Sequence, residues 1–190
     1  MKCYAITHKG LVRESNEDCC FIPERGENFA VVCDGMGGHL AGEVASRTAI
    51  DSMRRSLDGA NPGQEMLREA IREANIDVYR LAQDKPEYTG MGTTLTAIWW
   101  TDEKVLMGHV GDSRLYKFEG GKLTHLSHDH TYVQELVDLG EISEAEARTH
   151  PRRNLITRAI GTRLSVEIDT AAFERTPGSV YLICSDGLTN

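Results

Sequence analysis

Hydrophobic and polar residues follow two different periods in the first third of the chain. Three short runs rich in β-branched and aromatic residues, bounded by turn-forming residues, predict strands at Cys3–Thr7, Asp18–Ile22 and Phe29–Cys33. From about Ala41 to Leu57 the apolar residues recur at helical spacing, which predicts a helix. The chain is therefore expected to begin with strands and to continue into helix.

A second helix is predicted to begin next to Asn61. Asn61 can cap the helix, Pro62 suits its first position, and Gln64 stands where a capping box places Glu or Gln. An apolar stripe from Leu67 to Leu81 then gives this helix one face to bury.

After this helix the pattern changes to period two and to continuous apolar runs. It predicts strands at Thr93–Thr101, Val105–Val110, Arg114–Phe118, Lys122–Ser127, Val166–Glu174 and Ser179–Cys184. The first four are expected to form a meander with hairpin turns at residues 102–104 and 119–121. Blocks of strands, helices and strands favour an α+β fold over a parallel βαβ sheet.

Two short helices are predicted between these strands, at Tyr132–Leu139 and Ser143–Thr149. Ser143 and Glu146 form a capping-box pair for the second of them. Residues 151–163 fit neither pattern clearly.

The length and charge of the chain narrow its class. At 190 residues it suits a single domain, residues 1–190, and its formal net charge of −8 disfavours binding to nucleic acid or to an anionic membrane. No apolar run approaches the roughly 20 residues of a membrane span, and the N-terminus lacks the apolar core of a secretory signal. The expected location is the cytoplasm.

The cysteines predict reduced thiols rather than disulfides or a metal site. Their number is odd, they show no C-x-x-C spacing, and three of them, Cys3, Cys33 and Cys184, lie in apolar runs. We interpret them as small core residues in a reducing compartment.

Acidic residues follow the predicted strands at several points. Asp34, Asp112 and Asp186 each come directly after an apolar run and next to a small residue, and Glu17 and Asp18 lead into another strand. One such aspartate is an ordinary turn former. Several that converge at the end of a sheet repel one another unless a cation lies among them, and ligands that are all oxygen select Mg²⁺ or Mn²⁺.

Competing chemistries find little support. The histidines form no H-E-x-x-H motif and no Cys/His quartet, and the chain has neither a P-loop nor a G-x-S-x-G elbow. The glycine-rich stretch at residues 35–39 resembles a phosphate cradle only loosely.

Six motifs occur in the order of one known family. They are LVRESNED (11–18), DGMGGHLAGEVAS (34–46), GTT (92–94), GHVGDSRLY (108–116), SHDHT (127–131) and CSDGLT (184–189). Together they resemble the metal-dependent protein Ser/Thr phosphatases of the phosphatase 2C, or PPM, type. The DGMGGH form is similar to the prokaryotic branch, where other branches often carry His in place of Met36.

The resemblance implies a β-sandwich of two antiparallel sheets flanked by helices, with two Mn²⁺ or Mg²⁺ ions at one end and a third, weaker ion. Asp34 would bridge the two main ions and the Gly35 carbonyl would bind one of them. Asp186 would hold the other, with Glu17 and Asp18 contributing directly or through water. Asp112, together with Asp186, would hold the third ion.

The resemblance also implies a catalytic role for Arg13, which would grip the substrate phosphate. The leaving serine or threonine needs a proton, and His39 lies in the same motif as Asp34, so it is a candidate general acid. A metal-bound water is the alternative donor. His128 and His130, which flank Asp129, are interpreted as structural.

The segment from about Glu141 to Arg163 falls where the family has its variable flap. Phosphorylated proteins, the substrates of a Ser/Thr kinase, are the expected partners, and the chain is expected to be a monomer.

The chain departs from the family at its end. The family continues past the S-D-G strand to another metal-binding Asp in a D-N motif, and no D-N dipeptide occurs here. We therefore expect a fragment of a longer phosphatase. The alternative is a non-catalytic PPM-like module that binds metals weakly, or a partner, without turnover.

Overall fold

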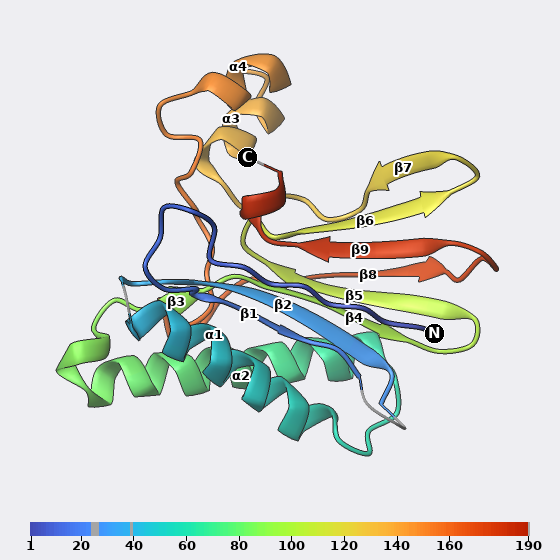
Figure 1. Ribbon diagram of the computed structural model, residues 1–190, viewed down its shortest axis with the longest axis horizontal. Helices are drawn as coiled ribbons and strands as arrows, with labels where there is room; N and C mark the ends of the chain where they lie inside the picture. Colours follow the sequence, from blue (N-terminus) through green and yellow to red (C-terminus); the bar gives the residue numbers. More distant parts are fainter. Residues whose placement is uncertain (24–26, 39, 190) are drawn as a thin grey trace.

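A computed structural model describes residues 1–23, 27–38 and 40–189 and contains two antiparallel sheets with a helix layer (Figure 1). The larger sheet has the strand order β1-β2-β4-β5-β8, with β3 paired to β2, and the smaller has the order β7-β6-β9. The strands are β1 (Asp18–Phe21), β2 (Phe29–Met36), β3 (Gly92–Thr93), β4 (Leu95–Trp100), β5 (Lys104–Val110), β6 (Arg114–Glu119), β7 (Lys122–His125), β8 (Asp169–Glu174) and β9 (Val180–Cys184).

The helices fall into two groups. The long helices α1 (Leu40–Leu57) and α2 (Gln64–Asp84) cover one face of the larger sheet, whereas the short α3 (Tyr132–Asp138) and α4 (Glu144–Thr149) project from the end of the sandwich (Figure 1). Single 3₁₀ turns lie at Pro86–Tyr88 and Asp186–Leu188. No helix among the described residues is both long and apolar enough to cross a membrane.

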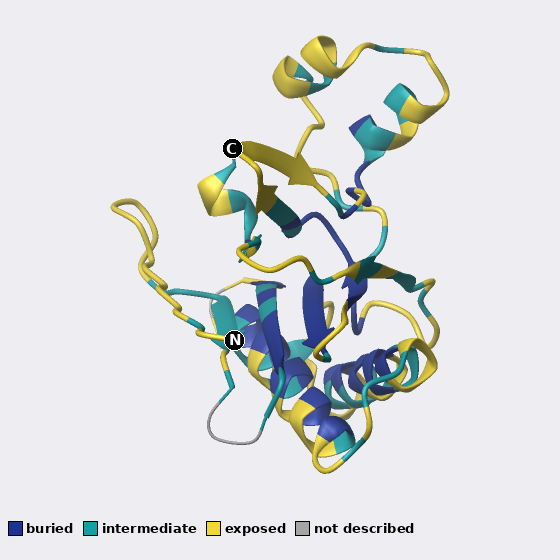
Figure 2. Cartoon of the chain, turned by 90° about the vertical axis from the view of Figure 1, so that its right-hand side faces the viewer, coloured by how far each residue is buried: buried dark blue, intermediate teal, exposed yellow. Residues whose placement is uncertain are grey.

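Two hydrophobic cores follow from the alternation along the strands of the larger sheet. Leu95, Ala97 and Trp99 of β4 face the helices, and Ile98 and Trp100 face the smaller sheet. Because β4 is buried on both faces, its sequence is a continuous apolar run rather than an alternating one. Figure 2 shows this buried centre, in dark blue, between the short helices α3 and α4 and the layer formed by α1 and α2.

The predicted α+β sandwich is confirmed, and most predicted elements lie within a few residues of their expected positions. The predicted strand Cys3–Thr7 is wrong, because that segment pairs with no strand of either sheet and has no regular structure. The second helix begins at Gln64 rather than at Pro62, with Gly63 at the N-cap and no capping side chain.

The predicted meander is also wrong at one point. Strands β4 and β5 pair in one sheet and β6 and β7 pair in the other, so the chain crosses between sheets after β5. Gly111 occupies this crossing with φ of +110°, and a Cβ there would lie 2.6 Å from Thr94 Cγ2. The crossing brings Asp112 to the end of the sandwich where Asp34 and Asp186 lie.

Candidate metal and phosphate site

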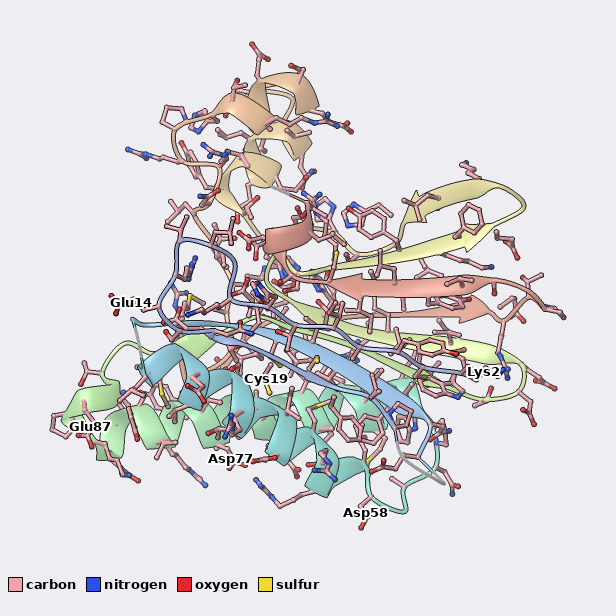
Figure 3. The ribbon with its side chains drawn as sticks, in the orientation of Figure 1. Lys2, Glu14, Cys19, Asp58, Asp77 and Glu87 are labelled. Carbon is pink, nitrogen blue, oxygen red and sulfur yellow. The ribbon has the colours of Figure 1, made fainter. Side chains whose placement is uncertain are left out.

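A cavity of about 690 Å³ opens at this end of the sandwich. Most of the predicted site residues line it, namely Arg13, Glu17, Asp34, Gly35, Asp112 and Asp186. Glu14, labelled in Figure 3, belongs to the N-terminal loop that forms one side of the cavity. His39 lies outside the described residues.

Asp18 and Asp34 are direct partners across the antiparallel pair β1 and β2. Asp34 has the same parity along β2 as Ala30, which faces the smaller sheet, so its carboxylate is expected between the two sheets. Burial first, then the charges of Asp18 and Asp186, raises the pKa of Asp34 to about 8. The strand pairing therefore forces together two carboxylates that repel each other.

Asp186 and Asp112 complete the acidic group from the smaller sheet and from the crossing loop. Ser185, which precedes Asp186, donates a hydrogen bond of 2.8 Å from its Oγ to Asp18 Oδ2, and so links the end of β9 to β1. Burial first, and then the charge of Asp186, raises the pKa of Asp112 to about 6. Four aspartates from four segments thus interact electrostatically at this end.

Glycine at position 35 is required by the packing of α1 against β2. A Cβ at Gly35 would lie 2.1 Å from the carbonyl oxygen of Gly42 and 2.7 Å from that of Glu17. The Gly35 N–H also donates a hydrogen bond of 3.2 Å to the Glu17 carbonyl oxygen. The family resemblance implied a role for the Gly35 carbonyl oxygen, and the structure adds this close backbone approach.

Arg13 lies at the mouth of the cavity. Its Nη1 is 3.4 Å from Glu17 Oε2, and its side chain is 70% exposed whereas that of Glu17 is 10% exposed. This contact is long, so most of the guanidinium fork remains accessible to a ligand. Both residues are among the predicted site residues, and both line the cavity.

Several residues that shape the cavity were not predicted as site residues. Asn154, Leu155 and Ile156 form part of its wall, and they belong to the stretch whose structure the sequence left ambiguous. Thr94, in the GTT motif, accepts a hydrogen bond of 2.9 Å from the Asp34 backbone N–H through its Oγ1. The motif pointed to this threonine but not to its function.

His128 and His130 fit the structural interpretation. His130 Nδ1 accepts a hydrogen bond of 3.0 Å from the Gly111 N–H, and its Nε2 lies 3.2 Å from Asp169 Oδ2. His128 Nε2 lies 2.7 Å from Asp138 Oδ2, near the end of α3. Both therefore hold loops beside the cavity and do not line it.

The acidic group fits hard divalent cations. Asp34 and Asp112 form no ion pair with a Lys, Arg or His in the described part of the chain, and burial first, then the charges of neighbouring aspartates, raises the pKa of both. The donors are all oxygen atoms, which Mg²⁺ and Mn²⁺ prefer.

Within residues 1–23, 27–38 and 40–189, no three His, Cys, Asp or Glu side chains are grouped closely enough to hold one ion among them. The arrangement implied by the sequence uses one or two carboxylates for each ion, with a carbonyl and waters as further ligands, so it does not require such a group.

Comparison with known proteins shows the family. The model of the protein phosphatase 2C family matches residues 9–190. The serine/threonine protein phosphatase PstP of Mycobacterium tuberculosis is 42% identical over 189 residues, which are 98% of this chain and 36% of PstP. The serine/threonine phosphatase stp of Listeria monocytogenes is 39% identical over 97% of this chain and 76% of its own length.

Solved structures agree with the sequence relatives. Stp1 of Staphylococcus aureus matches with a TM-score of 0.89 and 36% identity, over 97% of this chain and 75% of that one. The catalytic domain of PstP, crystallised with two manganese ions, matches with a TM-score of 0.83 and 40% identity, over 95% and 75% of the two chains.

The chain belongs to the protein phosphatase 2C family. It spans about a third of the length of PstP and about three quarters of the Listeria phosphatase.

Proposed function

We propose that this chain carries the catalytic machinery for hydrolysing phosphoserine and phosphothreonine on proteins with the help of two divalent cations, Mn²⁺ or Mg²⁺, and a third, weaker one. One observation carries the proposal: burial and the charges of Asp18, Asp186 and Asp112 raise the pKa of Asp34 at a cavity that an exposed arginine also lines. Its bacterial relatives are serine/threonine phosphatases, and one was crystallised with two manganese ions.

The carboxylates have distinct parts in this proposal. Asp34 would bridge the two main cations, the Gly35 carbonyl would bind one, and Asp186 would bind the other. Glu17 and Asp18 would contribute directly or through water. When bound, two such ions lower the pKa of a shared water toward about 7 and so supply hydroxide at neutral pH.

Arg13 would bind and orient the phosphoryl group. Its planar guanidinium can donate to two phosphoryl oxygens at once, which the ammonium of a lysine cannot do in the same geometry. The exposure of Arg13 at the mouth of the cavity suits a phosphorylated side chain that projects from a protein surface. His39 remains our candidate for protonating the leaving oxygen, with a metal-bound water as the alternative.

Asp112, with Asp186, would hold the third ion, and residues 141–163 would form the flap beside the substrate. The natural substrates are expected to be proteins phosphorylated by a Ser/Thr kinase in the cytoplasm, and the phosphatase is expected to act as a monomer. The second candidate function is a non-catalytic PPM-like module that binds metals weakly, or a partner, without turnover.

Hydrolysis assays separate the two functions. A phosphothreonine peptide and p-nitrophenyl phosphate are incubated with the 190-residue chain and with the protein expressed from its complete coding sequence, first with Mn²⁺ and then with EDTA. The enzyme function predicts turnover that Mn²⁺ supports and EDTA abolishes, at least in the complete protein. Absence of turnover in both forms, with Mn²⁺ bound, would leave the binding module.

A further inference from the structure

A chain of buried polar groups runs from Asp34, at the floor of the cavity, into the space between the two sheets. The Asp34 N–H donates to Thr94 Oγ1 at 2.9 Å, and this hydroxyl lies 2.7 Å from Ser113 Oγ. Thr96 Oγ1 lies 2.9 Å both from the Ser113 carbonyl oxygen and from His109 Nδ1. The four side chains, Thr94, Ser113, Thr96 and His109, are fully buried.

The contacts of His109 fix which of its nitrogens carries the hydrogen. Burial lowers the pKa of His109 to about 4, so the ring is neutral and carries one N–H. Its Nε2 lies 2.9 Å from the His128 carbonyl oxygen, which can only accept, so Nε2 is the donor. Nδ1 is then an acceptor, and it shares the single hydroxyl hydrogen of Thr96 with the Ser113 carbonyl oxygen, which lies at the same distance.

The far end of this chain of polar groups reaches the wall of the cavity. His128 lies in the loop before α3, and this loop runs beside the flap-like segment. The His130 carbonyl oxygen accepts from the Thr157 N–H at 2.9 Å, and the Tyr132 N–H donates to the Leu155 carbonyl oxygen at 2.9 Å. Leu155 lines the cavity, so the loop held by His109 also holds part of that wall.

Packing alone would favour an apolar side chain at position 109 rather than an imidazole. The neighbours of His109 on β5, such as Leu106, Met107 and Val110, are buried apolar residues. Burying an imidazole costs free energy unless both nitrogens are satisfied, whereas an apolar residue of similar size carries no such cost. Both nitrogens of His109 are satisfied, by partners on two different segments.

We propose that His109 is a positioning residue for the phosphatase site, an inference that rests on the proposed function. Through Thr96 and Ser113 it fixes the hydroxyl of Thr94 that holds the Asp34 backbone. Through its Nε2–H it fixes the loop that carries one wall of the cavity. It thereby sets the distance between the metal-binding floor and the surface against which the phosphoryl group is placed.

The test uses variants that interrupt the chain of polar groups at different points in the complete protein. Thr96→Val keeps the shape of the side chain and removes the hydroxyl between His109 and Ser113. His109→Leu removes both contacts of the ring, and His109→Gln restores a donor toward the His128 carbonyl oxygen. Ser52→Ala is the matched control, because Ser52 is also buried but donates to Asp77 on α2, in the helix layer (Figure 3).

The readouts are Mn²⁺ affinity by calorimetry, kcat and KM for a phosphothreonine peptide, and the unfolding temperature. Thr96→Val and His109→Leu are expected to weaken Mn²⁺ binding by about tenfold. Losses of this size are typical when a residue that hydrogen-bonds to a metal ligand is removed. His109→Leu should also raise KM, and His109→Gln should return KM toward the wild-type value. Ser52→Ala should lower the unfolding temperature without changing Mn²⁺ affinity.

Two results would overturn the inference. One is Mn²⁺ affinity unchanged in Thr96→Val, which decides the matter even if His109→Leu fails to fold. The other is a KM that His109→Leu leaves unchanged. Wild-type protein that binds Mn²⁺ but never hydrolyses a phosphopeptide would instead overturn the proposed function, and the calorimetry would still test the link between His109 and the floor.

Discussion

Asp112 and Asp129 line the same second cavity, of about 590 Å³, and are buried to the same extent, with 9% and 8% of their surface exposed. Their surroundings differ. Asp129 accepts three hydrogen bonds from the guanidinium of Arg114, at 2.6 to 3.1 Å. Asp112 has Asp186 as the charge that most affects it, and its pKa rises to about 6.

This is the difference expected between a structural carboxylate and the metal-binding carboxylate proposed for Asp112. Asp129 raises the pKa of Arg114 by accepting its hydrogen bonds. The pairing of the two opposite charges compensates for the burial of both. Asp34 and Asp112 form no such ion pair with a Lys, Arg or His among the described residues, and burial raises the pKa of each. Bringing such carboxylates together destabilises a fold that has only its own contacts, whereas a site that binds cations from solution requires several carboxylates close to one another.

The largest effect should follow from removing the central carboxylate of the cavity. Asp34→Ala is expected to lower turnover of the complete protein by more than about a thousandfold, because a bridging ligand contributes several kcal/mol to the reaction. In EDTA the same variant should unfold at a higher temperature than wild type, because the unfavourable burial of this carboxyl among other aspartates is gone. Turnover and differential scanning fluorimetry measure the two effects.

The control for this variant is Asp77→Ala, which removes a carboxylate paired with Arg55 on the helix layer (Figure 3). It should leave turnover unchanged. Substantial turnover of Asp34→Ala at saturating Mn²⁺ would contradict the bridging role.

Removing Asp129, the carboxylate paired with Arg114, should lower stability and leave metal binding unchanged. Asp129→Ala leaves a partly buried Arg114 without its partner, so we expect the free energy of unfolding to fall by about 2 to 4 kcal/mol. Mn²⁺ affinity should remain at the wild-type value. Urea unfolding and calorimetry measure the two quantities, and loss of Mn²⁺ binding in a folded variant would make Asp129 part of the metal site.

Asp112→Ala gives the matched test at equal burial. Because Asp112 is proposed to hold only the third ion, the variant should keep both tighter sites and lose about tenfold in turnover, which corresponds to about 1.4 kcal/mol. Its stability without metal should not fall, in contrast to Asp129→Ala. Loss of both tight sites in calorimetry would show that the third-ion assignment is wrong.

Much of the fold could be predicted from the sequence, because the period of apolar residues is a local property. The runs at β2, β4 and β9 and the capping box at Ser143 appear where they were expected. The segment Cys3–Thr7 could not be judged this way, because a strand also requires a neighbour to pair with. The change of sheet after β5 is likewise a matter of long-range pairing rather than of local pattern.

The candidate site shows the same limit. Its carboxylates and Arg13 could be named because they stand in short motifs, and all of them except Asp18, which pairs with Asp34, line the cavity. Leu155 could not be named from the sequence, because nothing in its local sequence shows that it lines the cavity. The chain of polar groups from Thr94 to His109 was also missed, since its members lie on separate segments and meet only in the folded protein.

The smallest effect concerns the stability of the metal-free protein as pH changes. The carboxyls of Asp34 and Asp112 have pKa values of about 8 and about 6 in the fold, and near 4 when unfolded. Between these values the folded state holds protons that the unfolded state has released, so the stability they contribute is complete below about pH 4 and is lost as pH rises through the folded pKa values. In EDTA the unfolding temperature should therefore fall by several degrees between pH 5 and about 8.

Saturating Mn²⁺ should remove or reverse this decrease in unfolding temperature with pH, because the cations bind the ionised carboxylates and the fold then gains stability as protons leave. Fluorimetry across this pH range, with Asp34→Ala as the variant that should flatten the slope, distinguishes this origin from a general effect of net charge. A slope that is the same in wild type and in Asp34→Ala would place its cause outside the acidic group.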